Sequence, residues 1–231
     1  MAEIYSNAPL IEAVFEIRFP AELSIKTHTD DFYNKIKTDF PLIGTHPFGS
    51  PHLYDFRSQE GTRIVKVGLD KISFHAHKYN GGFSEFQENA LKYTQLFINT
   101  YKIEKLARTG LRYINYIPFV RIEGCIPIEK YINFGYAIKS DSIPNRFEAL
   151  HTILLVKVGS GNIQILVQSK EIENVIKSEV LVLDFDYFLK DELRADNIIH
   201  YISESHTHTK KIFEDLITED YRKAMRGADE S

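Results

Sequence analysis

The chain has 231 residues, of which 43% are hydrophobic and 26% charged, and its formal net charge at pH 7 is −4. No apolar run approaches the ~20 residues that cross a bilayer, so no membrane association is expected, and the acidic balance argues against a surface built throughout to neutralise nucleic-acid phosphates. Because Cys125 is the only cysteine, an internal disulfide and a cysteine-based zinc cluster are excluded, and with no secretory signal pattern we expect a cytoplasmic protein.

The first half of the chain alternates between strand and helix patterns. A strand is predicted at 11–19, a short polar helix at 30–38, strands at 62–67 and 71–77, and a long helix from 86 to 101. Apolar residues recur along one side of the long helix at helical spacing, so this helix should lie on a sheet.

The second half follows the same order of elements. The predicted elements are strands at 110–117, 147–158, 162–168 and 179–188, a short helix at 127–133 and a long helix at 198–217. Residues 136–146 form the longest expected loop. No linker rich in glycine, serine or proline separates the halves, which predicts one fused body.

A short stretch of sequence occurs in both halves. Val65-Lys-Val-Gly68 returns as Val156-Lys-Val-Gly159, each time at the end of a strand and before a tight turn. Together with the repeated order of elements, this predicts a pseudo-duplicated unit, with a first repeat at 1–104 and a second at 105–231.

The tight turns imply antiparallel strand pairing, so the expected fold class is α+β. We expect a curved antiparallel sheet with the long helices on one face and the other face free. Such an arrangement resembles the saddle of the TATA-binding protein and the helix-grip folds. Any binding site should then lie on the free face or between helix and sheet.

Charged residues interrupt apolar patterns in two strands. Arg108 and Arg112 share one face of a strand, and Asn115 points to the other face. Asp184 and Asp186 share a face near the end of another apolar strand. Because a buried charge is costly unless it is paired, these side chains should meet.

A histidine, His206, occupies the centre of the apolar stripe on the last long helix. We expect it to join the charged residues at the helix–sheet junction of the second half. There these side chains either form hydrogen bonds and ion pairs with one another or bind a phosphate or carboxylate group of a ligand. The ligand-binding candidates are Arg108, Arg112, Asn115, Asp184, Asp186 and His206.

Four motifs occur in order along nearly the whole chain. They are 7–17 (NAPLIEAVFEI), 108–115 (RTGLRYIN), 183–186 (LDFD), and His206 followed by 213–218 (FEDLIT). This combination resembles a sporadically distributed, uncharacterised prokaryotic family of similar length. The resemblance implies a mobile or defence-associated gene neighbourhood but no activity. The positions it carries over are Pro9, Glu12, Arg108, Arg112, Asn115, Asp184, Asp186, His206 and Thr218.

Signals for cofactor or metal chemistry are weak. His75 and His77 alternate on a strand and can share an ion, but exposed histidines without a metal are the favoured interpretation. Asn80-Gly-Gly82 precedes a helix without the lysine and hydroxyl residue of a phosphate-binding loop. No nucleophile motif surrounds Cys125, so we expect no catalytic residue, no metal and no cofactor.

The favoured function is therefore a non-catalytic binding or accessory module of unknown ligand. A protein or small-molecule partner is favoured over nucleic acid, and a homodimer stays open. One alternative is an enzyme that binds a phosphate ligand through the Arg/Asp/His cluster, supported by Glu12, Glu16 and Arg18 in strand spacing. Another is a nucleic-acid-binding saddle, with Lys66 and Lys157 in matching positions of the repeats.

Overall fold

The computed structural model describes residues 5–47, 50–77, 82–133, 135, 147–172 and 178–227. The first half comprises β1 (Leu10–Arg18), α1 (Ser24–Thr27), α2 (Thr29–Ile36), β2 (Leu42–Thr45), β3 (Tyr54–Arg57), β4 (Arg63–Val67), β5 (Lys71–His77) and α3 (Gly82–Tyr101). The second half comprises β6 (Lys105–Phe119), the 3₁₀ turn η1 (Ile128–Lys130), β7 (His151–Val158), β8 (Gly161–Ile172), β9 (Ser178–Arg194), the 3₁₀ turn η2 (Ala195–Asn197), α4 (Ile198–Leu216) and α5 (Glu219–Met225). The predicted loop at 136–146 lies outside the described residues.

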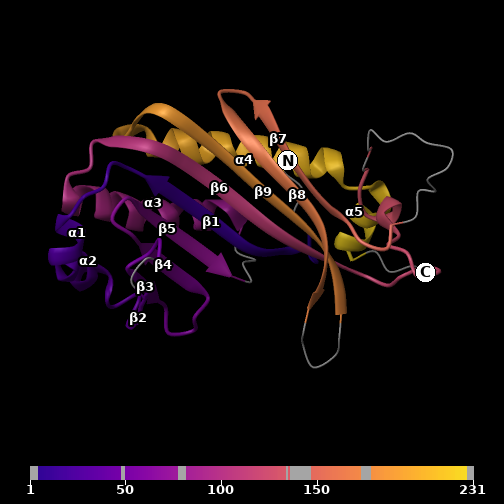
Figure 1. Cartoon of the computed structure of the whole chain (residues 1–231), viewed down its shortest axis with the longest axis horizontal. Coiled ribbons are helices and arrows are strands. Elements are labelled where there is room, and N and C mark those ends of the chain that lie inside the picture. Colours follow the sequence, from indigo (N-terminus) through magenta and orange to yellow (C-terminus); the bar gives the residue numbers. More distant parts are fainter. Residues whose placement is uncertain are drawn as a thin grey trace.

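All described strands form one antiparallel sheet in the order β2-β3-β4-β5-β1-β6-β9-β8-β7 (Figure 1). The first strand of each half lies at the centre, where Phe15 of β1 is opposite Leu111 of β6. The remaining strands of each half extend outward from this central pair. A single hydrogen-bonded ladder therefore joins the two halves.

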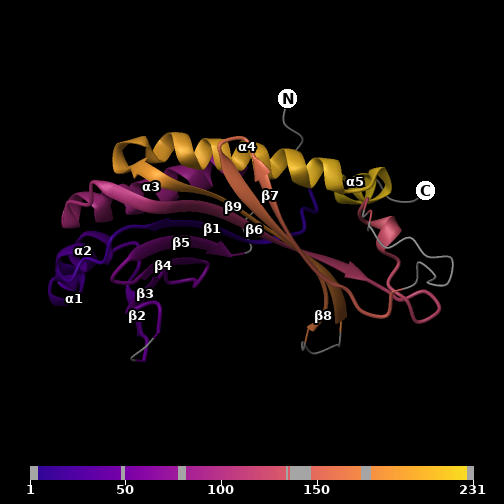
Figure 2. The same cartoon turned by 45° about the horizontal axis from the view of Figure 1, so that its top comes forward.

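The long helices α3 and α4 lie on the same face of the sheet (Figure 2). Most strand residues that point toward them are apolar and form the core, as Phe74 does against Phe86 of α3 and Phe185 against Phe213 of α4. We call the opposite face the polar face; on β1 it carries Glu12 and Glu16. None of the described helices combines the length and the apolar character that crossing a membrane requires.

The α+β class, the antiparallel sheet and the helix cover are confirmed. Two short strands, β2 and β3, were not predicted, because four residues without a clear alternation give too weak a signal. The helix expected at 127–133 is only the 3₁₀ turn η1. The strand expected from 147 begins at His151, since Phe147 instead forms an isolated bridge with Ile126.

The repeated Val-Lys-Val-Gly words do not mark equivalent hairpins. The β4–β5 hairpin lies directly against β1, whereas β9 separates the β7–β8 hairpin from β6. Val65 thus lies in an inner strand, and Val156 lies in the edge strand. The shared four-residue sequence reflects the residues that an apolar strand needs before a tight turn. The predicted residue-by-residue correspondence between the two halves is therefore wrong.

Candidate functional site

Alternation along β6 sorts the RTGLRYIN motif onto the two faces of the sheet. Arg108, Gly110 and Arg112 point to the polar face. Tyr113 and Asn115 point to the face that the helices cover, where Tyr113 reaches α4. The motif thus supplies arginines to one side and packing residues to the other.

Arg108 is a largely enclosed cation of the polar face, with its side chain only 12% exposed. Its Nη2 donates to both carboxylate oxygens of Asp186, at 2.9 and 2.7 Å, and its Nη1 donates to Glu16 Oε1 at 3.1 Å. The guanidinium also lies over the Phe188 ring, 4.7 Å from its centroid. Gly110 leaves room for it, because a Cβ there would lie 2.7 Å from Arg108 Nη1.

Arg112 makes a second bidentate ion pair. Its Nε donates to Asp184 Oδ1 at 2.8 Å and its Nη2 to Asp184 Oδ2 at 2.5 Å. The hydrogen bonds to Asp184 raise the pKa of Arg112 above its ordinary value. Burial raises the pKa of Asp186, and the charges of Arg108 and Arg112 counteract this rise.

The structure brings four of the six predicted site residues together and separates the other two. Arg108, Arg112, Asp184 and Asp186 meet on the polar face, not at the helix–sheet junction. Their pairing follows from β6 and β9 being neighbours, with Arg112 opposite Asp186 in register.

Asn115 and His206 lie on the helix-covered side of the sheet. Asn115 is buried and donates to the Leu183 carbonyl at 3.1 Å. His206 stacks on Phe83 with ring centroids 3.6 Å apart, and its Nδ1 lies 2.8 Å from the Tyr113 hydroxyl. Asn115 thus lies on the strand face opposite the two arginines, as its spacing predicts. The expectation that His206 joins the charged cluster is wrong, because sequence spacing cannot tell which sheet face the helix covers.

Pro9 and Thr218, two further positions that the resemblance singles out, have structural roles. The Pro9 carbonyl accepts a hydrogen bond from the Tyr116 amide at 2.9 Å, which ties the entry of β1 to β6. Thr218 is the N-cap of α5: its Oγ1 accepts from the Tyr221 amide at 3.2 Å and donates to the Lys130 carbonyl at 2.6 Å.

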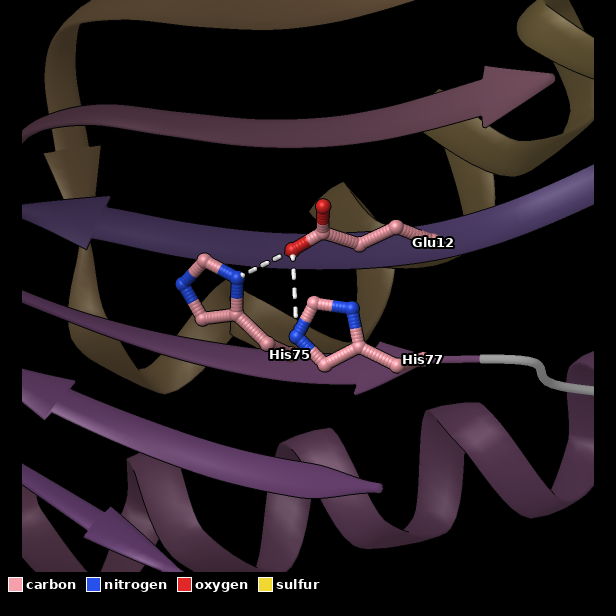
Figure 3. A group of neighbouring side chains, drawn as sticks. All are labelled: Glu12, His75 and His77. Atoms are coloured by element: carbon pink, nitrogen blue, oxygen red, sulfur yellow. Dashed lines mark hydrogen bonds and ion pairs between the residues drawn. The ribbon is translucent and has the colours of Figure 1, made fainter. Parts of the chain in front are cut away.

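A cluster that the sequence did not reveal as a unit lies where β1 meets β5 (Figure 3). Glu12 is opposite His77 in register, and Glu12 Oε1 lies 2.7 Å from His75 Nδ1 and 3.7 Å from His77 Nε2. The other ring nitrogen of His75, Nε2, lies 2.9 Å from Ser73 Oγ. Sequence spacing paired the two histidines but could not add Glu12, which is 63 positions from His75.

The surroundings favour neutral His75 beside an ionised Glu12. Burial lowers the pKa of His75, although the hydrogen bond to Glu12 acts in the opposite direction. Burial also acts to raise the pKa of Glu12, but the hydrogen bond from His75, aided by the charge of Lys66, lowers that pKa overall. A neutral imidazole and a carboxylate are the forms in which these side chains bind metal ions.

The edge strand β7 exposes large apolar side chains on both of its faces. Ile153, Leu154, Leu155 and Val156 are 54%, 44%, 66% and 44% exposed. A run of β-branched and aliphatic residues is typical of a buried strand. The run instead lies at the end of the sheet.

No protein-family model matches this sequence, and no curated protein shows significant similarity to it.

Protonation of His206 is expected to destabilise the fold in acid. Burial, assisted by the charge of Lys210, lowers the pKa of His206 to about 4 from 6.5, so the unfolded chain takes up the proton first as the pH falls below 6.5. The free energy of unfolding of the wild type should therefore fall between about pH 7 and about pH 4.5. His206→Phe should make this fall smaller by about 1–2 kcal/mol, a figure that allows for partial solvent screening. Urea unfolding at both pH values measures it.

The matched control is His200→Phe, on the same helix but exposed to solvent. It should leave the pH dependence of the unfolding free energy unchanged. Equal pH dependence in the wild type and the His206→Phe variant would contradict the prediction.

Proposed function

We propose that the protein is a non-catalytic binding module whose interaction surface is the outer edge of β7, beside which the described residues place no further strand, and that the partner there is a second copy of the chain. The observation that carries the proposal is the run of four consecutive exposed apolar residues on this edge strand. A long, apolar edge presents unpaired backbone groups together with side chains that gain from leaving water. Such edges are a recurrent mode of strand addition between proteins.

The two edges of the sheet differ in the way this proposal requires. The β2 edge has only four residues, Leu42–Thr45, and Pro41 precedes it directly. The β7 edge has eight residues, none of them proline or glycine. Lys157 is the only Asp, Glu, Lys or Arg residue among them. Short strands and proline protect a sheet edge from further pairing, and β7 has neither protection.

The hairpin that joins β7 to β8 determines which peptide groups of β7 face outward. Val158 and Gly161 are opposite each other across a two-residue turn, with Gly159 at a φ of +58°. The residues that flank such a turn form a hydrogen-bonded pair, and hydrogen-bonded pairs recur at every second position. The peptide groups of His151, Ile153, Leu155 and Lys157 therefore point away from β8.

These outward positions are compatible with antiparallel pairing around a two-fold axis. In such a dimer residue i of one copy faces residue j of the other, and j faces i, so odd-numbered positions pair with odd-numbered positions. With the axis at Leu154, Ile153 of each copy faces Leu155 of the other. The same register sets Lys157 beside His151, at the ends of the apolar contact.

The charged cluster on the polar face supports a binding module over an enzyme. Arg112 makes a bidentate ion pair with Asp184, and Arg108 donates through Nη2 to Asp186 and through Nη1 to Glu16. Both guanidinium groups are therefore paired with carboxylates without a ligand phosphate. His206, the histidine that the enzyme alternative assigned to this cluster, lies on the other side of the sheet. The enzyme alternative therefore loses the convergence on which it depended.

A nucleic-acid saddle is likewise less favoured. Lys66 lies on the polar face among carboxylates such as Asp55 and Glu16, and this mixture predicts weak affinity for phosphates. We expect the protein to pass through an immobilised double-stranded DNA column at about physiological ionic strength without retention. Retention that salt reverses would favour the saddle instead.

We further propose that the two halves descend from one duplicated unit, as in saddle folds of the TATA-binding-protein type. The strand order supports this, since β5 lies beside β1 as β9 lies beside β6, and each half ends in a long helix on the same face. Membership of the prokaryotic family that the motifs resemble, with its mobile or defence-associated setting, is part of the same proposal.

Sedimentation velocity over a concentration series tests the dimer. One pair of edge strands buries less than the ~800 Å² per partner of a standard interface, so we expect a reversible dimer with a dissociation constant in the micromolar range. If the chain stays monomeric at concentrations up to about ten times that range, the proposed pairing with a second copy is wrong. The partner of β7 would then be a strand of a different protein.

A further inference from the structure

Three potential metal ligands from two strands converge on the polar face, at the junction of β1 and β5. The ligand atoms of Glu12, His75 and His77 all lie within 4.8 Å of one another (Figure 3). The side chains of Glu12 and His75 are mostly buried, whereas that of His77 is 36% exposed and opens the cluster to solvent. Neighbouring strands hold the three groups in place, since Glu12 is opposite His77 in the ladder.

We propose that Glu12, His75 and His77 bind one divalent transition-metal ion of the zinc class. Two imidazole nitrogens and one carboxylate oxygen suit Zn²⁺, Co²⁺ or Ni²⁺, whereas Ca²⁺ and Mg²⁺ prefer oxygen ligands throughout. Three protein ligands leave one tetrahedral position for water or an external ligand. The site goes beyond the function proposed above, because four strands separate β5 from the β7 edge.

The spacing of the ligands is close to what such an ion needs. Nitrogen and oxygen ligands lie about 2.0–2.2 Å from zinc, which in a tetrahedral site sets them about 3.4 Å apart. The Glu12–His77 separation of 3.7 Å already agrees, and the Glu12–His75 separation of 2.7 Å must widen by less than ~1 Å. A rotation of the Glu12 side chain can widen this contact, while the ligand nitrogens of His75 and His77, which lie within 4.8 Å of each other, must approach by up to about 1.4 Å.

Ser73 completes the arrangement as a positioning residue for His75. Its hydroxyl is 2.9 Å from His75 Nε2 and can either donate or accept. Without metal, His75 Nδ1–H donates to Glu12 and Ser73 donates to Nε2. With metal on Nδ1, the neutral ring carries its proton on Nε2 and donates it to Ser73, the outer-shell contact that orients ligating histidines.

One nearby group opposes cation binding. The charge of Lys66, on the adjacent strand β4, lowers the pKa of both His75 and Glu12 and therefore also acts on a bound cation. We expect the affinity to be moderate for this reason. Lys66→Gln should therefore tighten metal binding. A Glu–His cluster with a purely structural role would bind no metal in either the wild type or this variant.

The test is a Co²⁺ titration of the untagged, metal-free protein, followed by visible absorption and competed with Zn²⁺. We expect one ion per chain, with an absorption spectrum typical of four-coordinate cobalt. His77→Ala should weaken binding at least about tenfold, and Ser73→Ala, which retains all three ligands, by about 10–100-fold. Thermal unfolding with a chelator present checks that each variant is folded.

The matched control is His200→Ala. His200 is exposed on α4 and lies 3.6 Å from Glu204. It therefore forms a second histidine–glutamate pair, which an ion can reach from solvent. His200→Ala should bind Co²⁺ like the wild type. No binding to the wild type, unchanged binding in a folded His77→Ala variant, or loss of binding in His200→Ala each overturns the proposal.

Discussion

Replacing Arg108 with alanine is expected to lower the free energy of unfolding by about 3–5 kcal/mol, because it leaves the mostly buried carboxylate of Asp186 without its paired cation. Asp186 loses a bidentate partner at 2.7–2.9 Å, and Glu16 loses a contact at 3.1 Å. Burial already raises the pKa of Asp186, so its charge is poorly tolerated without the arginine. Urea unfolding at neutral pH measures the change.

The matched control for this prediction is Arg18→Ala. Arg18 also contacts Glu16, at 2.7 Å, but its side chain is far more exposed, so we expect a loss of no more than about 1 kcal/mol. A second variant separates charge from packing. Arg108→Met combined with Asp186→Asn should be more stable than Arg108→Met alone, since it removes the stranded charge. Equal effects of the Arg108 and Arg18 substitutions would show that the ion pair contributes little.

Leu155→Lys is expected to weaken self-association about a hundredfold or more, while the fold is retained, because pairing would bury an ammonium group without a partner. Leu155 is the most exposed residue of the β7 run and contributes little to the core of the monomer. Sedimentation velocity gives the dissociation constant. Ile199→Lys, an equally drastic change at an exposed apolar residue of α4, should leave it unchanged.

Proline substitutions test the proposed backbone pairing directly. The Leu155 amide points outward, so Leu155→Pro should block strand addition at little cost to the monomer, as proline is tolerated on an edge strand whose amide faces solvent. The Leu154 amide faces β8, so Leu154→Pro should destabilise the hairpin itself. Dimerisation of the Leu155 variants with wild-type affinity would remove β7 from the interface.

Sequence periodicity predicted the long elements well, because strand and helix repeats of apolar residues are set by the local backbone. It also predicted that Arg108 and Arg112 would pair with aspartates, since residues two or four apart on a strand share a face and buried charges need partners. It could not tell which face of the sheet the helices cover. For this reason His206 was assigned to the charged cluster, although Tyr113 and Phe83 hold it on the other side.

Two features required knowledge of which strands are neighbours. Glu12 joins His75 and His77 only because β1 pairs with β5, and the same alternating pattern would fit several other pairings. The apolar run of β7 has the composition of a central strand, and its exposure follows from its place at the end of the sheet. Local sequence does not contain either fact.

The central place of β1 has a consequence for how the chain folds during synthesis. β1 leaves the ribosome before both of its partner strands; it can pair with β5 once the N-terminal half has emerged, but its other edge faces β6 of the half still to come. The nascent N-terminal half therefore carries an open strand until translation proceeds well past Phe119. Protection of that strand by a chaperone, or a pause in elongation before residue 105, would determine the yield of folded protein.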